Sequence, residues 1–487
     1  MLHESQFVKH FLEMYKKIGT LIAAVLLVHV GLAKVGDNEG NGHNITITVK
    51  GYSDTVCYLA GYFGKKQYYK DTSAFNSRGV CEFKGDDPLP PGIYSIILPG
   101  NTYFEFIINE QEFQLSTDTG NLVANMEVKN SLENKLFYEH FNLVASLQKD
   151  AAGYKKALDR LSEKDDTDST KIIRKKLREV NSQVEDYKLG IMKNYPESFL
   201  SHLFKAMKDP EIPKPPKDEN GKVIDSLFQY KYLKRHFWDN VDFSTDNILR
   251  TPIYHGRLMR FMEKMTAQIP DSINASADAL LALAVQNDEI FKYTLSKIIY
   301  KYETSKIMGM DAVFVHLAEK YYMTGMAASW VDSVQLFKIS DRVRSIKPTL
   351  IGKQAPPLYN LKDRNGKLMP LYSIDADYLM IVFWDPDCGH CKKEMPKIKG
   401  VYDKFKDKGL KVYAVCTELE RDKWIAYMEK HEYDWINVAD FELRSPFREF
   451  YDIDSTPKIF LLDKDKKIIA KKIGHEQLEK ILKRKLK

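Results

Sequence analysis

The chain has 487 residues, of which 44% are hydrophobic and 29% are charged, and its formal net charge is +6. At a usual domain size of about 100 to 200 residues, this length predicts about three domains, and the composition is that of a folded protein with ample apolar core. The positive charge comes from lysines spread over the chain, including runs at 464–472 and 480–487. We interpret these runs as solvated faces, because no basic stripe with interleaved aromatic residues accompanies them, so nucleic-acid binding is not expected.

The N-terminal segment has the pattern of a secretory signal. Lys16 and Lys17 precede an apolar run at 18–32, and Gly31-Leu-Ala33 provides a small-x-small cleavage site. The run is shorter than the about 20 residues of a bilayer span, so residues 1–33 are predicted to be a signal peptide, with an uncleaved anchor as the alternative. Export would place the protein in the periplasm or cell envelope, where disulfides persist.

Residues 44–125 predict an N-terminal β-sandwich. Ile45, Ile47 and Val49 alternate with polar residues, and further strand-like runs follow between Gly- and Pro-rich turns. These runs lie at 56–63, 67–70, 80–84, 93–98, 103–108 and 112–115. Cys57 and Cys81 fall within two of them. The two cysteines fit either buried thiols that pack as small hydrophobes or a cross-strand disulfide.

From residue 130 to 345 the apolar period becomes helical, which predicts a central α-helical domain. Its clearest helix carries one apolar stripe before Pro196, formed by Ile173, Leu177, Val180, Val184, Tyr187 and Ile191. Further helices are predicted at 274–286, 289–302, 312–322 and 330–340. The histidines of this region show no metal-ligand spacing, so no metal site is expected there.

The stretch at 379–396 predicts a buried strand that runs into a helix beginning at a Cys-x-x-Cys motif. Residues 379–384 are apolar, Asp385-Pro386-Asp387 ends the strand, and Cys388 falls at the N-terminus of the next helix. Unpaired N–H groups and the dipole at that end stabilise a thiolate and lower a cysteine pKa from about 8.5 toward about 3.5 to 7. Cys388 is therefore the predicted nucleophile. Cys391 lies one turn later on the same face and can resolve a mixed disulfide.

Three motifs around these cysteines carry a family resemblance. Residues 352–367 precede the strand, Cys388-Gly-His-Cys391 runs on into Lys392-Lys-Glu394-Met-Pro396, and Ser455-Thr456-Pro457 precedes a strand at 458–462. Together they resemble the TlpA/ResA-like thioredoxin-fold thiol–disulfide oxidoreductases, here as the C-terminal domain of a multidomain Gram-negative envelope protein. The resemblance covers residues 350–487 and implies a C-terminal α/β thioredoxin fold.

The resemblance also implies which residues meet the substrate. Pro457 would be the proline of the cis-proline loop, and Thr456 would offer its backbone to a substrate strand beside the two sulfur atoms. Trp384, at the end of the predicted strand, is also predicted to bind the substrate, together with Thr456 and Pro457.

Proton transfer involves a separate set of residues. By resemblance, Glu394 is the family's buried acid near Cys391 and would accept its proton, with an exposed helix glutamate as the alternative. His390, between the cysteines, would stabilise the thiolate. Val382 occupies the strand position where many thioredoxins carry an aspartate. The proton must therefore pass to Glu394, His390 or water.

Other kinds of site fit these residues less well. A zinc site would need two further ligands, and no second Cys-x-x-Cys pair exists. A peroxidase of the peroxiredoxin type would carry Thr and Arg beside its cysteine, which the segment 385–391 lacks. Cys416, at the end of a predicted strand, is interpreted as a buried free thiol, with a resolving or regulatory role as the alternative.

These observations predict an exported thiol–disulfide oxidoreductase that acts on protein thiols and disulfides. It would need no cofactor beyond the redox-active Cys388–Cys391 disulfide, and a membrane electron-transfer partner would keep the pair in its working state. A histidine between the cysteines favours an oxidising couple, whereas the TlpA-like context implies a reductant, so both directions stay open. The alternative is a cell-envelope scaffold that uses the thioredoxin fold as an interaction module. The sequence leaves the oligomeric state open.

Overall fold

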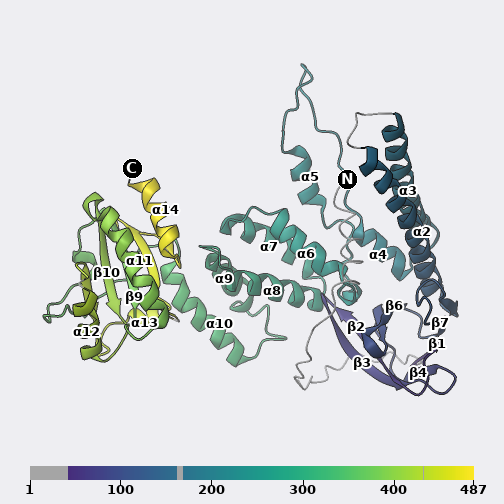
Figure 1. Cartoon of the computed structure of the whole chain (residues 1–487), viewed down its shortest axis with the longest axis horizontal. Helices are drawn as coiled ribbons and strands as arrows, with labels where there is room; N and C mark the ends of the chain where they lie inside the picture. Colours follow the sequence, from purple (N-terminus) through teal and green to yellow (C-terminus); the bar gives the residue numbers. More distant parts are fainter. Residues whose placement is uncertain (1–41, 162–167, 432, 454, 487) are drawn as a thin grey trace.

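The computed structural model describes residues 42–161, 168–431, 433–453 and 455–486. The predicted signal peptide at 1–33 lies outside these residues. Along the described chain, a sheet-rich N-terminal part is followed by a helical middle and an α/β C-terminal part (Figure 1). This order confirms the multidomain organisation predicted from the sequence.

The N-terminal part is built from two sheets around one core. Its strands are β1 (His43–Lys50), β2 (Val56–Phe63), β3 (Lys66–Ala74), β4 (Val80–Gly85), β5 (Gly92–Ile97), β6 (Tyr103–Ile108), β7 (Glu112–Asp118) and β8 (Glu127–Lys129), with a short 3-10 turn η1 (Pro99–Asn101). The sheets have the orders β4-β1-β7-β8 and β3-β2-β5-β6. Ile47 of β1 and Phe104 of β6 share the core and are fully buried. The alternation in β1 therefore faces every second side chain inward, as predicted.

The middle of the chain consists of helices. They are α2 (Leu132–Leu161), α3 (Asp168–Asn194), α4 (Phe199–Met207), α5 (Phe228–His236), η2 (Asp246–Arg250), α6 (Ile253–Lys264), α7 (Pro270–Ala284), α8 (Asp288–Glu303), α9 (Asp311–Leu317), η3 (Ala318–Tyr322) and α10 (Ser333–Ile346). The helices α2 and α3 pair along their length (Figure 1). The helix predicted before Pro196 is α3, and Tyr187 of its stripe donates a hydrogen bond to the carbonyl of Leu136 on α2, 3.2 Å away.

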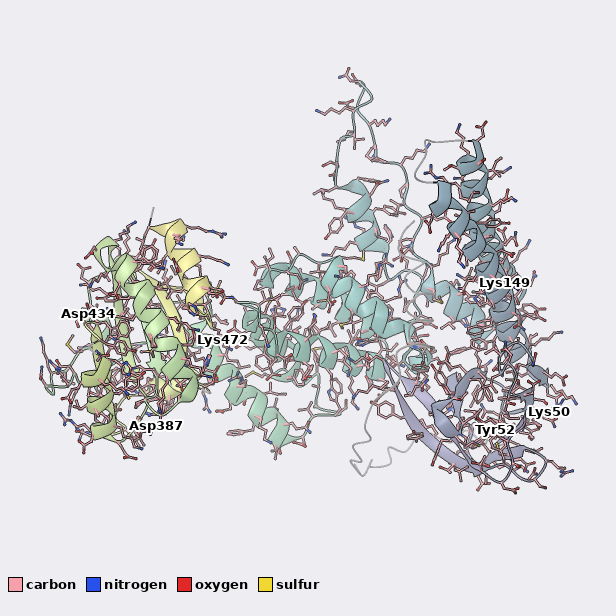
Figure 2. The ribbon with its side chains drawn as sticks, in the orientation of Figure 1. Lys50, Tyr52, Lys149, Asp387, Asp434 and Lys472 are labelled. Carbon is pink, nitrogen blue, oxygen red and sulfur yellow. The ribbon has the colours of Figure 1, made fainter. Side chains whose placement is uncertain are left out.

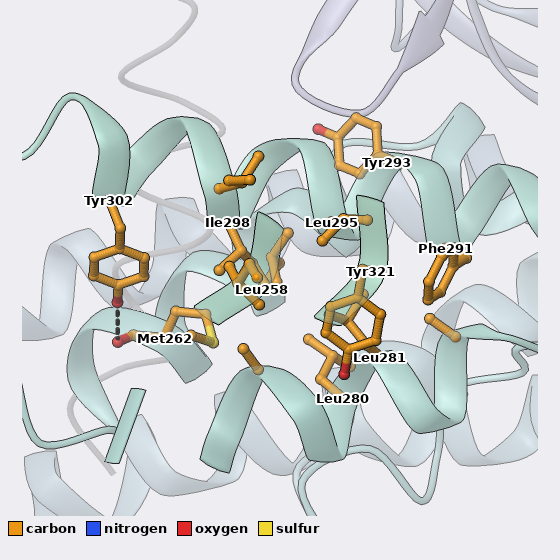
Figure 3. Packing of buried hydrophobic residues seen from close by; sticks show 14 of the residues in the cluster. Leu258, Met262, Leu280, Leu281, Phe291, Tyr293, Leu295, Ile298, Tyr302 and Tyr321 are labelled. Carbon is orange, nitrogen blue, oxygen red and sulfur yellow. Dashed lines mark hydrogen bonds between the residues drawn. The ribbon is translucent and has the colours of Figure 1, made fainter. Parts of the chain in front are cut away.

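The central core of the helical part lies between α6, α7 and α8 (Figure 3). Leu258, Leu280 and Leu295 come from these three helices and are fully buried. Burial of each such side chain contributes about 1.5 to 3 kcal/mol. The Tyr302 hydroxyl donates to the carbonyl of Met262, 3.4 Å away, so the polar group of this aromatic side chain is also satisfied in the core (Figure 3).

Helix boundaries follow local capping groups more closely than the apolar pattern. Asn287 accepts hydrogen bonds from the backbone N–H groups of Glu289 and Ile290, so α8 begins at Asp288. Asp332 caps α10 in the same way, and this helix begins at Ser333 and not at residue 330 as predicted. The helix predicted at 312–322 is α9, which continues as a π-helical turn, η3.

The C-terminal part is a five-stranded sheet covered on both faces. Its elements are η4 (Lys347–Thr349), η5 (Leu371–Ser373), β9 (Tyr378–Trp384), α11 (Gly389–Phe405), η6 (Lys406–Lys408), β10 (Leu410–Cys416), α12 (Arg421–His431), β11 (Ile436–Ala439), α13 (Phe447–Phe450), β12 (Lys458–Asp463), β13 (Ile468–Lys471) and α14 (His475–Lys485). The strand order is β11-β10-β9-β12-β13. β10 runs parallel to the central strand β9, and β12 runs antiparallel to it.

Strand β9 is apolar at every position because both of its faces are buried. Met380 and Val382 point into a core formed with α11, α12 and α14. Leu379 and Ile381 point into the opposite core, which includes residues of α13 and of the segment before β9. The strand is therefore held on both sides, and its C-terminal end has a fixed position.

The hairpin between β2 and β3 contacts the helical part of the chain. Gly64 has a left-handed φ of 63°, and its N–H donates to the carbonyl of Leu249 at 2.6 Å. The neighbouring Phe63 ring meets Tyr293 of α8 edge to face, with centroids 5.8 Å apart. A Cβ atom at Gly64 would lie 1.9 Å from the Tyr293 hydroxyl oxygen. Only glycine therefore fits at this contact.

We predict that Gly64→Ala destabilises the protein more than Gly100→Ala. Both glycines have positive φ, which costs a residue with a Cβ about 1 to 2 kcal/mol, but nothing lies within 4 Å of a Cβ at Gly100. The additional loss of thermal stability in Gly64→Ala measures the contact with Tyr293. Thermal unfolding of the full chain by circular dichroism tests this, and equal losses in the two variants would contradict it.

Candidate active site

The dithiol lies where β9 ends and α11 begins. Trp384 is the last residue of the strand, and Cys388 is the N-cap of the helix. The carboxylate of Asp385 accepts hydrogen bonds from the N–H groups of Asp387 at 2.7 Å and Cys388 at 3.3 Å, which fixes the turn between strand and helix. The predicted position of Cys388 at a helix N-terminus is thus confirmed.

The sulfur of Cys388 is half-buried and surrounded by hydrogen-bonding groups. It accepts a bond from the N–H of Cys391 at 3.4 Å, and the Cys388 thiol donates to the carbonyl oxygen of Thr456, also at 3.4 Å. Partial burial opposes ionisation of this thiol. Hydrogen bonding with Thr456, with Cys391 and with the backbone of His390 outweighs it, so the pKa of Cys388 is lowered.

Cys391 has the opposite electrostatic environment. It is fully buried among apolar side chains, and this burial raises its pKa to about 12. Both cysteines are free thiols in the structure. The half-buried Cys388 is thus the more acidic thiol of the pair, and the fully buried Cys391 retains its proton at neutral pH.

The loop opposite the cysteines contains a cis peptide bond between Thr456 and Pro457. Because Cys388 contacts the Thr456 carbonyl, the structure brings together four predicted site residues: both cysteines, Thr456 and Pro457. A cavity of about 320 Å³ lies beside them, lined by His390, Glu394, Ser455, Pro457, Lys458, Ile459, Lys472, Ile473 and Gly474. Figure 2 shows Lys472 on the side of the C-terminal part nearer the helices, and Asp434 on its far side.

Glu394 is half-buried and its carboxylate is fully engaged. It accepts from Lys397 Nζ at 2.9 Å and lies 2.8 Å from Nδ1 of His475. Burial would raise the pKa of Glu394, but these two partners outweigh it and lower the pKa. Glu394 lines the cavity as an ion-paired carboxylate, which makes it a weaker proton acceptor than a buried acid without such partners would be.

Sequence reasoning missed His475 as a residue of the site. It is the first residue of α14 and lies 81 positions after Glu394. No local pattern in the sequence connects the two residues. The packing of α14 against α11 brings them together.

Trp384 does not lie where a substrate would meet it. Its side chain is fully buried, and its ring packs against Tyr427 with centroids 5.0 Å apart. The predicted contact with substrate is therefore corrected to a packing role in the core below the dithiol. The apolar pattern of β9 continues to its last residue, so the buried strand predicted at 379–384 already included Trp384.

His390 and Cys416 differ in exposure. His390 is exposed and lines the cavity, while its backbone assists Cys388. Cys416 ends β10 opposite Trp384, is buried as predicted, and has a pKa raised to about 12 chiefly by burial.

Within the described residues, no group of three or more His, Cys, Asp or Glu side chains is arranged to hold a metal ion. None of the helices described here has the length and hydropathy that a membrane span requires.

A dithiol at the start of a helix, facing a cis-proline loop that leads into an inner strand of a five-stranded sheet, defines the thioredoxin-fold class of thiol–disulfide oxidoreductases. Residues 351–471 match the AhpC/TSA family, and residues 43–137 and 157–348 match two domains of unknown function, DUF4369 and DUF5106.

Similar proteins of known name show the family to which the C-terminal part belongs. A thiol-disulfide oxidoreductase ResA of Bacillus cereus is 31% identical over 131 residues, which are 27% of this chain and 74% of that protein. A ResA of Bacillus thuringiensis subsp. konkukian is 32% identical over 137 residues, covering 28% and 78% of the two chains. The chain belongs to this family of thiol–disulfide oxidoreductases through its C-terminal part.

A solved structure is also similar in this region. The thioredoxin domain of a thiol-disulfide oxidoreductase from Bacteroides vulgatus is 28% identical, covers 28% of this chain and 98% of its own, and superposes with a TM-score of 0.27 over the whole chain.

We predict that alkylation separates the two thiols by pH. In the reduced protein, iodoacetamide should label Cys388 at pH values below the usual thiol pKa, because its thiolate is stabilised there. Cys391 should remain unlabelled until the pH approaches 12 or the protein unfolds, because burial raises its pKa to about 12. Mass spectrometry of digests taken along a pH series locates the label. Labelling of both cysteines with the same pH profile would contradict the assignment.

Proposed function

We propose that this chain is an exported thiol–disulfide oxidoreductase that exchanges disulfides with protein substrates through Cys388-Gly-His-Cys391. The observation that carries the proposal is the opposite character of the two thiols. Cys388 is half-buried with a lowered pKa, and Cys391 is fully buried with a raised pKa. A scaffold that used the fold only for binding would not require this difference, so the scaffold alternative is not favoured.

In the reducing direction, the thiolate of Cys388 attacks one sulfur of a substrate disulfide. A mixed disulfide forms, and the other substrate sulfur leaves as a thiolate. Cys391 then attacks the Cys388 sulfur, loses its proton, and releases the second substrate thiol. The substrate gains two electrons, and Cys388 and Cys391 become a disulfide. The same steps in reverse oxidise a substrate dithiol, and the reduction potential of the couple decides the direction.

The buried thiol of Cys391 must lose its proton in the second step. The pKa of about 12 falls when the neighbouring Cys388 sulfur is bonded to substrate, because a neutral sulfur replaces a thiolate that raises it. Water that enters the cavity beside the Thr456–Pro457 loop and the Glu394 carboxylate that lines this cavity are the acceptors we assign to this proton. Because Glu394 is already ion-paired, we expect it to accept this proton less often than water does.

The substrate would bind along the Thr456–Pro457 loop. The Thr456 carbonyl already faces the Cys388 sulfur at 3.4 Å, so an extended substrate segment beside this loop would bring its own sulfur next to Cys388. The cavity beside the loop provides room for a neighbouring side chain of the substrate. His390 also lines this cavity.

Export and an electron donor complete the proposal. The apolar run at 18–32 with a small-x-small site supports an exported protein. An oxidising compartment contains no general reductant for the pair, so a membrane partner that supplies or removes two electrons would reset the dithiol after each turnover.

We predict that Cys388→Ser abolishes exchange, reducing the rate to that of the uncatalysed reaction, because the nucleophile is lost. Cys391→Ser should instead accumulate mixed disulfides with substrates, since nothing resolves them. Reduction of a model protein disulfide and non-reducing electrophoresis measure the two effects. Accumulation of mixed disulfides in Cys388→Ser and not in Cys391→Ser would reverse the two roles.

A further inference from the structure

Two cysteines away from the active site lie in contact between the sheets of the N-terminal part. Cys57 belongs to β2 and Cys81 to β4, which are strands of different sheets. Their sulfur atoms are 3.2 Å apart, and the residues are 0% and 2% exposed. The two thiols therefore meet inside the core that the sheets share.

The surroundings of this pair suit a disulfide better than two thiols. Both cysteines belong to one apolar core that also contains Leu59 and Phe83. A thiol is a weak hydrogen-bond donor and a weak acceptor, so the contact between the two groups contributes little as it stands. A disulfide requires its sulfur atoms about 2.05 Å apart, and the observed separation needs only a small approach of the two strands. Cys416, the other buried cysteine outside the dithiol, provides a contrast because its neighbours on β10 and β9 are Val415 and Trp384.

We propose that Cys57 and Cys81 are oxidised to a structural disulfide that joins the two sheets. The oxidant is another disulfide, either a small one such as oxidised glutathione or one in a protein. Each exchange breaks the S–S bond of the oxidant. In total Cys57 and Cys81 lose two electrons and two protons, and the oxidant leaves as two thiols. Because the folded sheets bury both sulfurs, the bond forms before the sheets pack or during their local opening. It does not depend on the function proposed for the C-terminal part.

A peptide map of the full chain tests this directly. The protein is refolded in a glutathione buffer with excess oxidised glutathione, alkylated in denaturant, and digested without reduction. We expect a cross-linked peptide that contains Cys57 and Cys81 and is two hydrogens lighter than its separate parts, while Cys416 is alkylated. Alkylation of both Cys57 and Cys81, in a sample where Cys388 and Cys391 are bridged, would overturn the proposal.

Thermal unfolding gives a second measurement. In a Cys388→Ser/Cys391→Ser background, dithiothreitol should lower the Tm by roughly 5 to 10 °C, because it removes a cross-link that restricts the unfolded chain. The same background with Cys57→Ala should show no response to dithiothreitol. An unchanged Tm in the first protein would contradict a stabilising disulfide.

A different observation links the helical part to the active site. The carboxylate of Asp452, which follows α13, lies between two cations. Arg342 of α10 donates to Oδ1, and Lys458 of β12 donates to Oδ2 at 3.1 Å. Asp452 and Lys458 are buried, with 8% and 5% of their side chains exposed. Lys458 directly follows Pro457 in the chain, and the carbonyl of Thr456 faces the Cys388 sulfur.

We infer that Arg342 is a positioning residue through which the helical part holds the Thr456–Pro457 loop against Cys388. This inference rests on the proposed function. A buried carboxylate between two cations fixes both of them, and removal of Arg342 leaves Asp452 with one partner fewer and free to shift with Lys458. A second buried ion pair, between Lys471 of β13 and Asp311 of α9, keeps the two parts docked when Arg342 is replaced.

The test compares Arg342→Gln with Arg344→Gln on the same helix, where Arg344 is 74% exposed and pairs with Asp341. Side-chain hydrogen bonding with Thr456 lowers the pKa of Cys388, and a loosened loop would weaken it. We therefore expect Arg342→Gln to move the pH profile of Cys388 alkylation to higher pH and to slow exchange several-fold, with partial rescue in Arg342→Lys. Cys391, Asp385, Asp387 and His390 are titratable groups near Cys388, and they are the same in all of these proteins.

Profiles that coincide in wild type, Arg342→Gln and Arg344→Gln would overturn the inference. A change in Tm alone, without a change in the alkylation profile, would show a merely structural role and would also overturn it. Alkylation needs no substrate, so this result is independent of whether Cys391→Ser traps mixed disulfides. Failure of the proposed function and failure of the positioning role can thus be told apart.

Discussion

The hydrogen bonds that the first turn of α11 offers to the Cys388 sulfur are the interaction on which the function depends. The N–H groups at a helix start have no partner within the helix, and one of them, from Cys391, points to this sulfur at 3.4 Å. The geometry requires a strand that delivers Cys388 to that position. Strand β9 does so because both its faces are buried, and Asp385 fixes the turn that follows. The reactivity of the Cys388 thiol therefore depends on the rigid strand and turn that hold it at the start of α11.

Burial then distinguishes the two sulfurs of the pair. One helical turn separates them, yet Cys388 faces the Thr456 carbonyl, whereas Cys391 faces the core that contains Met395. The local sequence places two identical groups side by side, and the tertiary structure gives them different pKa values. This difference orders the steps of an exchange reaction, because the half-buried Cys388 is both the more acidic thiol and the one more accessible to a protein substrate.

The sequence predicted those features that depend on neighbours in the chain. The alternation in β1, the stripe of α3 and the strand–turn–helix around Cys388 are local patterns, and the cis-proline loop at Thr456–Pro457 came from a family motif. Contacts between distant segments were not predictable. His475 is 81 residues from Glu394, and Arg342 is 110 residues from Asp452. Trp384 belongs to the strand that was predicted to be buried, and its burial contradicts its assignment to the substrate-binding residues.

The reduction potential of the Cys388–Cys391 couple shows whether these two thiols form a working redox pair. The purified protein is equilibrated with glutathione buffers of graded redox poise, and the fraction of bridged peptide is measured after acid quenching. We expect reversible, two-electron formation of one disulfide between these cysteines. A midpoint near thioredoxin's about −270 mV would indicate a reductant, and one near about −180 mV an oxidase or isomerase. If no disulfide forms between Cys388 and Cys391 at any poise, the protein is not a thiol–disulfide oxidoreductase of this kind.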